Sequence, residues 1–194
     1  GDHRDLHSFP TRRSSDLCKT AGVDVQFLSN VWGMDENAAK TAGDAADGVI
    51  FPLRTAVGWG GNAPGMKTVM EISKMSDPSG KVYRPVHYIA AVCSALYMKE
   101  ALDWAAKNGG ATGENVAKGF YQKKDWVPAG MDGVCNPSNW TEKDHRPTTK
   151  VDLYRAKVSG ATDGDINDLM GKGTIKLEKV KTVELPRKPE WFGW

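Results

Sequence analysis

The tripeptide Asp144-His145-Arg146 places three ionisable side chains together. A carboxylate next to an imidazole could carry acid–base chemistry, and both groups ligate metal ions. Adjacent side chains point in different directions, however, and no second histidine stands at ligand spacing. We therefore favour a structural turn or a surface ion pair over a catalytic or metal site. For His87, near the start of a long apolar segment, we favour a capping or hinge role over catalysis.

Two further motifs lack the features that their chemistry requires. Residues 58–65 read GWGGNAPG, but they lack the Gly-Lys-Ser or Gly-Lys-Thr ending of a phosphate loop and do not pass directly from a strand into a helix. No Gly-x-Ser-x-Gly motif is present, and Cys93 falls inside a predicted helix without an adjacent base. We predict no catalytic residues, no metal site and no cofactor, so the protein is not expected to be an enzyme.

The three cysteines are Cys18, Cys93 and Cys135. They are too few for a disulfide scaffold and show no CxxC spacing for zinc. For Cys93 and Cys135 two interpretations stay open. They are two buried thiols that pack as small hydrophobic side chains, or, in an extracytoplasmic protein, a disulfide that joins the long helix to residues 133–137. Counting thiols under denaturing, non-reducing conditions distinguishes the two.

Length and composition bound the fold class. The chain has 194 residues, of which 40% are hydrophobic and 26% charged, which suits one domain or one lobe with pieces of another. The net charge of +2 includes no basic stripe, so a nucleic-acid partner is not indicated. Lys99, Glu100 and Asp103 interrupt the longest apolar stretch, which favours a buried helix over a membrane span.

Residues 1–17, GDHRDLHSFPTRRSSDL, resemble the conceptual translation of a sequencing-library adapter over their whole length. The alternative is a basic, serine-rich tail. We exclude this leader from the fold prediction and expect its histidines and arginines to carry no function. We expect native sequence over residues 18–194 only, with the natural N-terminus and any signal peptide missing.

Strands and helices alternate from Cys18 onward. Apolar residues at alternate positions predict a strand over 23–28. An acidic first turn predicts a helix over 35–46. An apolar run closed by Pro52 predicts a second strand over 48–51. Strand, helix and strand at this spacing are typical of a βαβ unit in a parallel sheet. The predicted fold class is therefore α/β.

Helices are predicted next, followed by more strands. Apolar periodicity, Gly and Asn stop signals and a Thr112 cap indicate helices over 66–75, 85–107 and 113–121, with a turn at 77–80. Beyond Trp126 we predict a Gly-rich strand-and-turn segment over 127–135, an edge strand over 151–158 and a last strand or hairpin over 175–183.

Three stretches in this order resemble type I periplasmic solute-binding proteins of the branched-chain amino acid ABC transporter class. They are residues 25–30 with 47–50, residues 87–102, and residues 127–146. The resemblance implies two Rossmann-like, parallel-sheet lobes joined by crossing segments, which close over a solute by a hinge motion. It also implies an extracytoplasmic, periplasmic location and no chemistry. Residues 18–194 would then be the C-terminal part: the second lobe with elements that return to the first.

The resemblance also implies that the N-terminal half of such a protein is missing, with most of the first lobe and its contacts to the solute carboxylate. We expect the isolated chain to expose the apolar face that meets the missing lobe. Poor solubility and negligible ligand affinity are the expected consequences.

The resemblance implies ligand-binding residues where strands end at the cleft. Asn30, Val31 and Trp32 match the place where the family puts a group that faces the solute ammonium. Asn30 or Trp32 replaces the usual acidic residue, which argues against a simple leucine, isoleucine or valine ligand; Trp32 offers a cation–π or stacking face. Tyr88 matches an aromatic position, and Arg54 would pair with a carboxylate. Core or hinge packing is the alternative for each.

The function that the resemblance implies is solute capture for an ABC importer. The solute would be a branched-chain amino acid or a related amide or aromatic acid, and the partners would be the membrane permease subunits. The alternative is a ligand-sensing receptor domain on the same scaffold. A membrane helix or signalling domain after Trp194 would favour that alternative, and we expect the chain to end there.

Overall fold

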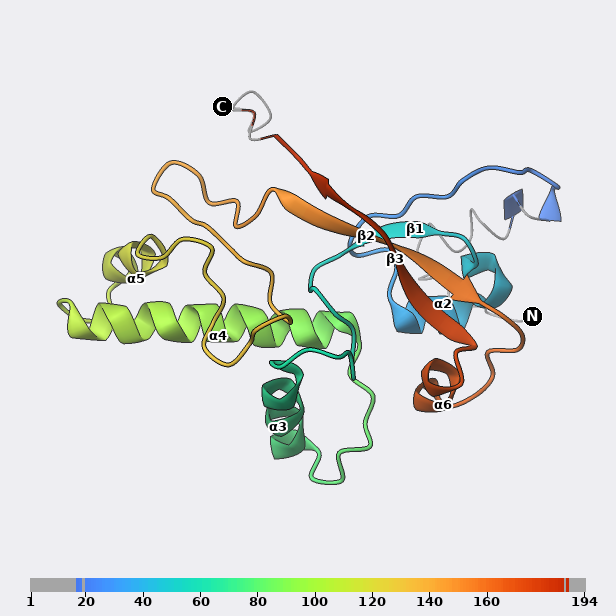
Figure 1. Ribbon diagram of the computed structural model, residues 1–194, viewed down its shortest axis with the longest axis horizontal. Helices are drawn as coiled ribbons and strands as arrows, with labels where there is room; N and C mark the ends of the chain where they lie inside the picture. The colour runs from blue at the N-terminus through green and yellow to red at the C-terminus, as the bar shows by residue number, and fades with distance from the viewer. Residues whose placement is uncertain (1–16, 19, 187, 189–194) are drawn as a thin grey trace, which may run out of the picture. The chain divides into compact units, whose positions relative to one another are not determined.

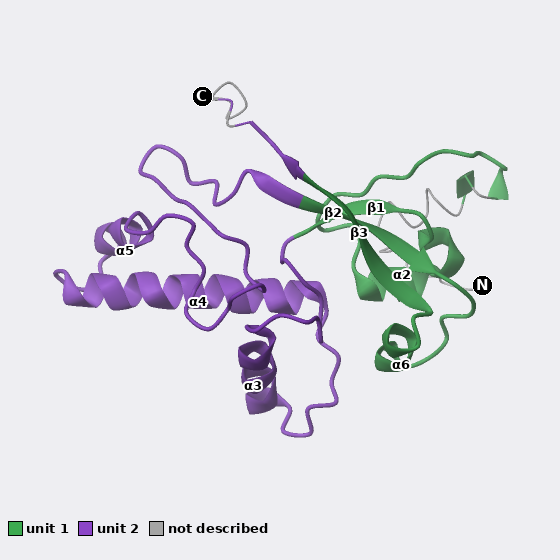
Figure 2. Cartoon of the chain, in the orientation of Figure 1, with its two compact units in different colours: residues 1–53, 152–182 green, residues 54–151, 183–194 purple. Residues whose placement is uncertain are grey.

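The computed structural model describes residues 17–18, 20–186 and 188 (Figure 1). The chain divides into two compact units: unit 1 comprises residues 1–53 and 152–182, and unit 2 comprises residues 54–151 and 183–194 (Figure 2). The predicted leader lies outside the described residues except for Leu17, which is exposed.

The helix predicted over residues 35–46 is present in unit 1. α2 (Glu36–Ala42) starts at Asp35, whose carboxylate accepts a hydrogen bond from the Ala38 N–H at 2.7 Å. A capped first turn is what an acidic residue there favours. The 3-10 helix η1 (Gly43–Ala46) continues it, and a positive φ of 60° at Gly43 ends the α-helical part. The prediction over 35–46 is thus confirmed, with a tighter last turn.

The sheet of unit 1 has the strand order β1-β2-β3. β1 (Ile50–Leu53) pairs antiparallel with β2 (Lys150–Val158), and β3 (Ile175–Glu184) lies on the other side of β2. β2 is therefore the middle strand, and the prediction of an edge strand over 151–158 is wrong. The connection between β2 and β3 carries α6 (Ile166–Gly171), which the sequence analysis did not predict.

The predicted strand over 23–28 is replaced by an isolated parallel bridge between Leu28 and Ile50. The Ser29 N–H donates to the Ile50 carbonyl at 2.8 Å, and the Ile50 N–H donates to the Phe27 carbonyl at 3.0 Å. Val23 and Val25 are about half exposed, so the alternating apolar face has no layer to bury it. Among the described pairings, this bridge is the only parallel contact of the predicted βαβ unit. Pro52, predicted to close the next strand, lies inside β1.

Unit 2 contains the three predicted helices: α3 (Met66–Ser76), α4 (Val86–Lys107) and α5 (Gly113–Phe120). Thr112 caps α5 as predicted, because its hydroxyl accepts the Asn115 N–H. α5 packs closely on α4: a Cβ added at Gly119 would lie 2.6 Å from the Ala101 carbonyl oxygen. Glycine at this position therefore sets how near the two helices approach.

An aromatic cluster fills the core of unit 2 against α4. Its rings are Tyr97, Phe120, Trp126 and Trp140. The Tyr97 ring meets Trp126 and Trp140 edge-on, at centroid distances of 5.0 Å each, which is the geometry that aromatic quadrupoles favour. The Tyr97 hydroxyl donates to the Asn136 carbonyl at 2.6 Å, and burial raises the pKa of this hydroxyl. The cluster thus ties α4 to the segment that follows α5.

A disulfide joins Cys93 in α4 to Cys135 in the turn before Asn136, with the two Cα atoms 5.7 Å apart. Only 6% of Cys93 and 2% of Cys135 is exposed, and both belong to the same core as Tyr97 and Trp126. Of the two interpretations left open by the sequence, the structure has the bonded pair. Cys18 is a free thiol.

A polar network around Glu100 fastens the loop after α5 to α4. The Glu100 carboxylate accepts the Trp126 indole N–H at 2.9 Å, the Ala129 N–H at 2.6 Å and the Lys123 ammonium at 2.6 Å. Burial alone would raise the pKa of Glu100, but the hydrogen bonds from these three donors outweigh it, and the pKa is lowered. The folded protein therefore favours the ionised carboxylate.

We expect Glu100→Gln to lower the free energy of unfolding by about 1.5–3 kcal/mol at neutral pH, the range for hydrogen bonds to a charged group. Because the folded pKa is lowered, the stabilisation is present above the ordinary glutamate pKa and is lost as the pH falls through the folded pKa. In urea unfolding between pH 7 and pH 3, the free energy of unfolding should fall less steeply with decreasing pH in the variant than in the wild type. Glu71→Gln, at an exposed ion pair, is the matched control. If the free energy of unfolding depends on pH equally in Glu100→Gln and the wild type, ionised Glu100 does not stabilise the fold as proposed.

Candidate functional site

Asn30, Val31 and Trp32 form a turn in unit 1 directly after the parallel bridge at Leu28. The Asn30 side-chain oxygen accepts the Trp32 N–H at 2.9 Å, and the Asn30 carbonyl accepts the Gly33 N–H at 3.2 Å. Such an Asx turn fixes the backbone locally. Val31 is half-buried, whereas 59% of Trp32 is exposed. The turn therefore presents a large aromatic surface at the carboxyl end of this strand-like segment.

Arg54 is the first residue after β1 and the first residue of unit 2. Its side chain is exposed, and its carbonyl accepts a hydrogen bond from the Asn136 side-chain amide at 3.3 Å. The next residue, Thr55, is fully buried, and its hydroxyl donates to the Val57 carbonyl. The backbone at Arg54 is thus anchored, while its guanidinium extends toward the surface.

Tyr88 lies in the first turn of α4 and is half-buried. The Arg84 guanidinium lies 4.7 Å from the centre of its ring, a cation–π contact. Arg84 is itself held by the hydroxyls of Ser73 and Ser76, which accept from its Nε at 2.8 Å and from its Nη2 at 3.0 Å. One face of Tyr88 is therefore occupied by a braced cation. The contact was not predicted from the sequence, because Arg84 precedes Pro85, the N-cap of α4, and four-residue spacing indicates neighbours only within a helix.

The predicted ligand-binding residues are divided between the two units. Asn30, Val31 and Trp32 belong to unit 1, and Arg54 and Tyr88 belong to unit 2 (Figure 2). Within unit 1 the three residues are consecutive in the sequence and share one turn, and their role in binding stays a prediction.

The tripeptide at 144–146 is a structural turn with an ion pair, as the sequence predicts. Asp144 accepts from the Arg146 guanidinium through two hydrogen bonds of 3.1 Å, while His145 stacks on Tyr121 instead, with its Nε2 2.9 Å from the Tyr121 hydroxyl. The three side chains therefore separate and form no acid–base constellation. Over the described part of the chain, no three His, Cys, Asp or Glu side chains group as metal ligands would.

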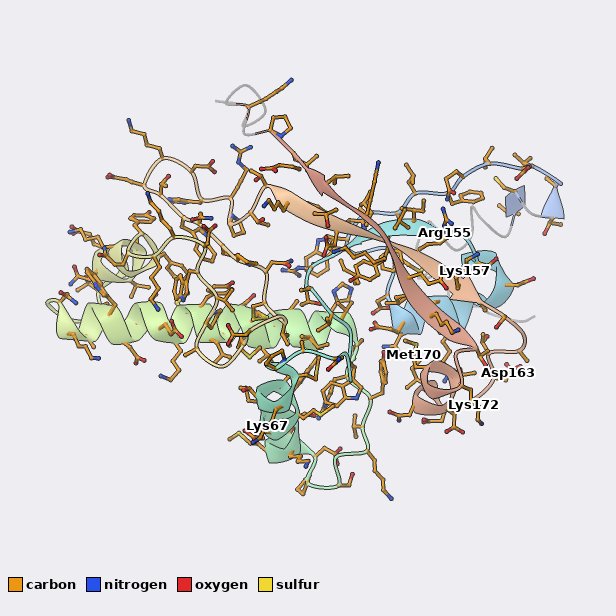
Figure 3. The ribbon with its side chains drawn as sticks, in the orientation of Figure 1. Lys67, Arg155, Lys157, Asp163, Met170 and Lys172 are labelled. Carbon is orange, nitrogen blue, oxygen red and sulfur yellow. A yellow bond between two sulfur atoms is a disulfide. The ribbon has the colours of Figure 1, made fainter. Side chains whose placement is uncertain are left out.

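A hollow of about 470 Å³ lies beside α3 in unit 2. Residues 60–63 and the exposed side of α3 line it, including Lys67 (Figure 3), which pairs loosely with Glu71 at 3.9 Å. Its walls come from one helix and one glycine-rich loop only, and it stays open to solvent. The glycine-rich segment therefore borders a surface depression of unit 2. The tight turn of this segment requires glycine at position 61, because a Cβ there would lie 2.8 Å from the Val57 side chain.

The chain shares its fold with solved solute-binding proteins. A branched-chain amino acid ABC transporter protein from Thermus thermophilus with bound valine matches at a TM-score of 0.68 and 15% identity, over 92% of this chain and 44% of that one. A solute-binding protein from Rhodopseudomonas palustris HaA2 in complex with p-hydroxybenzoic acid matches at a TM-score of 0.59 and 16% identity. The match covers 93% of this chain and 42% of that one. A leucine-binding protein from Thermotoga maritima matches at a TM-score of 0.59 and 12% identity, over 90% of this chain and 41% of that one.

These matches show a partial type I periplasmic-binding-protein fold, because the chain spans less than half the length of the solved structures it matches. The α/β fold class predicted from the sequence is thereby confirmed. No curated protein sequence matches the chain. No helix among the described residues is long and apolar enough to cross a membrane.

The family comparison is decisive for identity. The model of the periplasmic binding protein family matches residues 15–165, beginning three residues before the predicted native start at Cys18. The match covers well over half of the chain. The chain therefore belongs to the periplasmic binding protein family, whose members are extracytoplasmic binding proteins and not enzymes.

Proposed function

We propose that the protein containing this chain is the extracytoplasmic solute-binding component of an ABC importer. The observation that carries the proposal is the family match over residues 15–165, together with the shared fold of solute-binding proteins from such transporters. The protein would capture a small solute between its lobes and deliver it to the permease subunits in the membrane. Capture and release need no covalent step.

The solute class that we propose is an amino acid-like molecule: a branched-chain amino acid, a small amide or an aromatic acid. Two solved relatives hold valine and p-hydroxybenzoic acid, so one fold accommodates both chemistries. In this chain the Asn30–Trp32 turn supports a solute with an apolar or aromatic body, because Trp32 offers an exposed indole face and no carboxylate stands in the turn. Arg54 and Tyr88 are the proposed contacts from unit 2, with Arg54 suited to a solute carboxylate.

We expect Trp32→Ala in the natural protein that contains this chain to weaken solute binding at least about tenfold, since buried aromatic contacts dominate binding energies. The free energy of unfolding should stay within about 0.5 kcal/mol of the wild type, because the side chain is largely exposed. Calorimetric titration with valine, p-hydroxybenzoate and a small aliphatic amide measures the first effect, and urea unfolding measures the second.

Leu102→Ala is the matched control, an exposed apolar side chain on α4. It should change neither binding nor stability. Wild-type affinity in Trp32→Ala for the solute that the protein binds would remove this residue from the site. A loss of binding that is matched by a loss of stability would assign Trp32 a packing role instead.

A further inference from the structure

We propose that the Cys93–Cys135 disulfide forms before the core of unit 2 closes, by thiol–disulfide exchange between the open chain and a disulfide-bearing oxidant of the extracytoplasmic space. The chain would then be a substrate of thiol oxidation during folding. This inference concerns how the folded chain is made, and it does not rest on the proposed solute-binding function.

Both cysteines are buried in the folded chain. Cys93 is 6% and Cys135 2% exposed, and the side chains that share their core include Ile89 and Met131, which are fully buried. Thiol–disulfide exchange requires that the attacking thiolate reach a sulfur of the oxidant, so it depends on access to the thiol. In the closed core neither sulfur offers that access. An oxidant therefore meets these thiols only in a chain whose core is still open.

The two cysteines lie far apart in the sequence. They are 42 residues apart, and the segment between them carries α5 and Trp126 of the aromatic cluster. Cys93 faces the core from the middle of α4, and Cys135 reaches it from a turn whose N–H bonds to the Met131 carbonyl. Closure of the core around these two positions therefore shields both thiols in one step.

Cys18 is a free thiol. Three cysteines allow three single pairings, and only the one between Cys93 and Cys135 is present in the structure. Cys18 is half-buried in unit 1, so it stays open to reagents that cannot reach the core of unit 2. An open chain that meets an oxidant can therefore form wrong pairs with Cys18, which exchange must resolve before folding is complete.

The exchange balances in two steps. The thiolate of one core cysteine, after losing its proton to water, attacks the disulfide of the oxidant, forms a mixed disulfide and releases the second sulfur of the oxidant as a thiolate. The thiolate of the other core cysteine attacks the mixed disulfide, forms the Cys93–Cys135 bond and releases the remaining sulfur of the oxidant. The two cysteine thiols lose two protons and two electrons, and the oxidant ends as two thiols.

The test compares the order of oxidation and folding in the natural protein that contains this chain. The reduced, urea-denatured chain is diluted either directly into oxidised glutathione or first into reductant-free buffer without oxidant, with glutathione added later. Disulfide formation is followed by quenching with a maleimide and mass mapping of the Cys93–Cys135 link. Closure of the core is followed by near-ultraviolet circular dichroism of the aromatic cluster.

We expect the bond to form at least about tenfold more slowly when the core has closed before the oxidant is added. A reduced chain that fails to develop the aromatic signal, while the oxidised chain develops it, also supports the proposal, because closure then requires the bond. A reduced chain that develops the signal and still forms the bond at the open-chain rate would overturn it. A chain linked through Cys93 and Cys135 that has not yet developed the aromatic signal is the intermediate that the proposal expects.

Cys18→Ser is the control for mispairing. It should leave the difference between the two orders of addition unchanged, since Cys18 lies outside the core of unit 2. It should also remove the wrongly paired species from the mass map. If the difference disappears in Cys18→Ser, then capture of Cys18 and not burial of the core thiols controls the rate, and the proposal is wrong.

Discussion

Trp126→Ala is expected to lower the free energy of unfolding by about 3–5 kcal/mol, the range for removing a large aromatic side chain from a packed core. Trp126 is 3% exposed and packs against Tyr97 and Trp140 at centroid distances of 5.0 and 5.7 Å. Its indole N–H also donates to Glu100 at 2.9 Å. The substitution therefore leaves a cavity and takes one donor from a partly buried carboxylate.

Urea unfolding followed by far-ultraviolet circular dichroism measures this effect, and two variants bracket it. Trp126→Phe keeps much of the ring volume but removes the N–H, so it should cost clearly less than alanine. Trp32→Ala removes the same side chain from an exposed position in unit 1 and should change stability little. A similar small cost for Trp126→Ala and Trp32→Ala would show that the aromatic cluster does not hold unit 2 together.

The second large effect is expected for Cys93→Ala combined with Cys135→Ala. Removing the bond should lower the free energy of unfolding by about 2–4 kcal/mol, because a cross-link over a long loop restricts the unfolded chain. The loop here spans a sequence separation of 42 residues. The cavities left by two sulfur atoms in a buried core add to the loss.

Equilibrium unfolding of the double variant under non-reducing conditions measures the total loss, and the wild type in excess reductant separates the two contributions. The reduced wild type keeps its sulfur atoms, so it should fall between the oxidised wild type and the double variant. Cys18→Ser should match the oxidised wild type. Equal stability of the oxidised and the reduced wild type would contradict a stabilising role for the bond.

The helices of this chain could be predicted closely because their signals are local. Asp35 and Thr112 cap their helices through side-chain oxygens, as their residue types favour. The turn at Asp77 ends α3 and is closed by a hydrogen bond from the Gly80 N–H to the Asp77 carbonyl. α4 begins within a residue of its predicted start and ends where predicted. Local caps and apolar periodicity were sufficient for these boundaries.

The strands were harder to predict because their state depends on distant partners. The alternating residues at 23–28 look like a half-buried strand, but the described residues supply only the bridge to Ile50. β2 was predicted at an edge, and β3 makes it the middle strand of the sheet. α6 is only six residues long and lies in the connection between these strands, so its periodic signal is weak.

The ligand-binding role of the candidate residues stays a prediction from the resemblance. The turn at Asn30 has an Asx geometry, which is consistent with a residue type that favours turns. Arg84 and Glu100 were not predicted to anchor anything, because their partners are Ser73, Ser76 and the backbone of a loop 29 residues away. Such contacts depend on the packing of helices, and a sequence without its fold does not specify them.

The central claim is that the protein containing this chain binds a small amino acid-like solute and does not transform it. Isothermal titration of the natural protein with valine, p-hydroxybenzoate and a small aliphatic amide, followed by mass analysis of the recovered solute, tests it most directly. We predict saturable binding of at least one of the three at one solute per protein, with the solute recovered unchanged. Conversion of a bound solute, or no binding of any of the three, would contradict the claim.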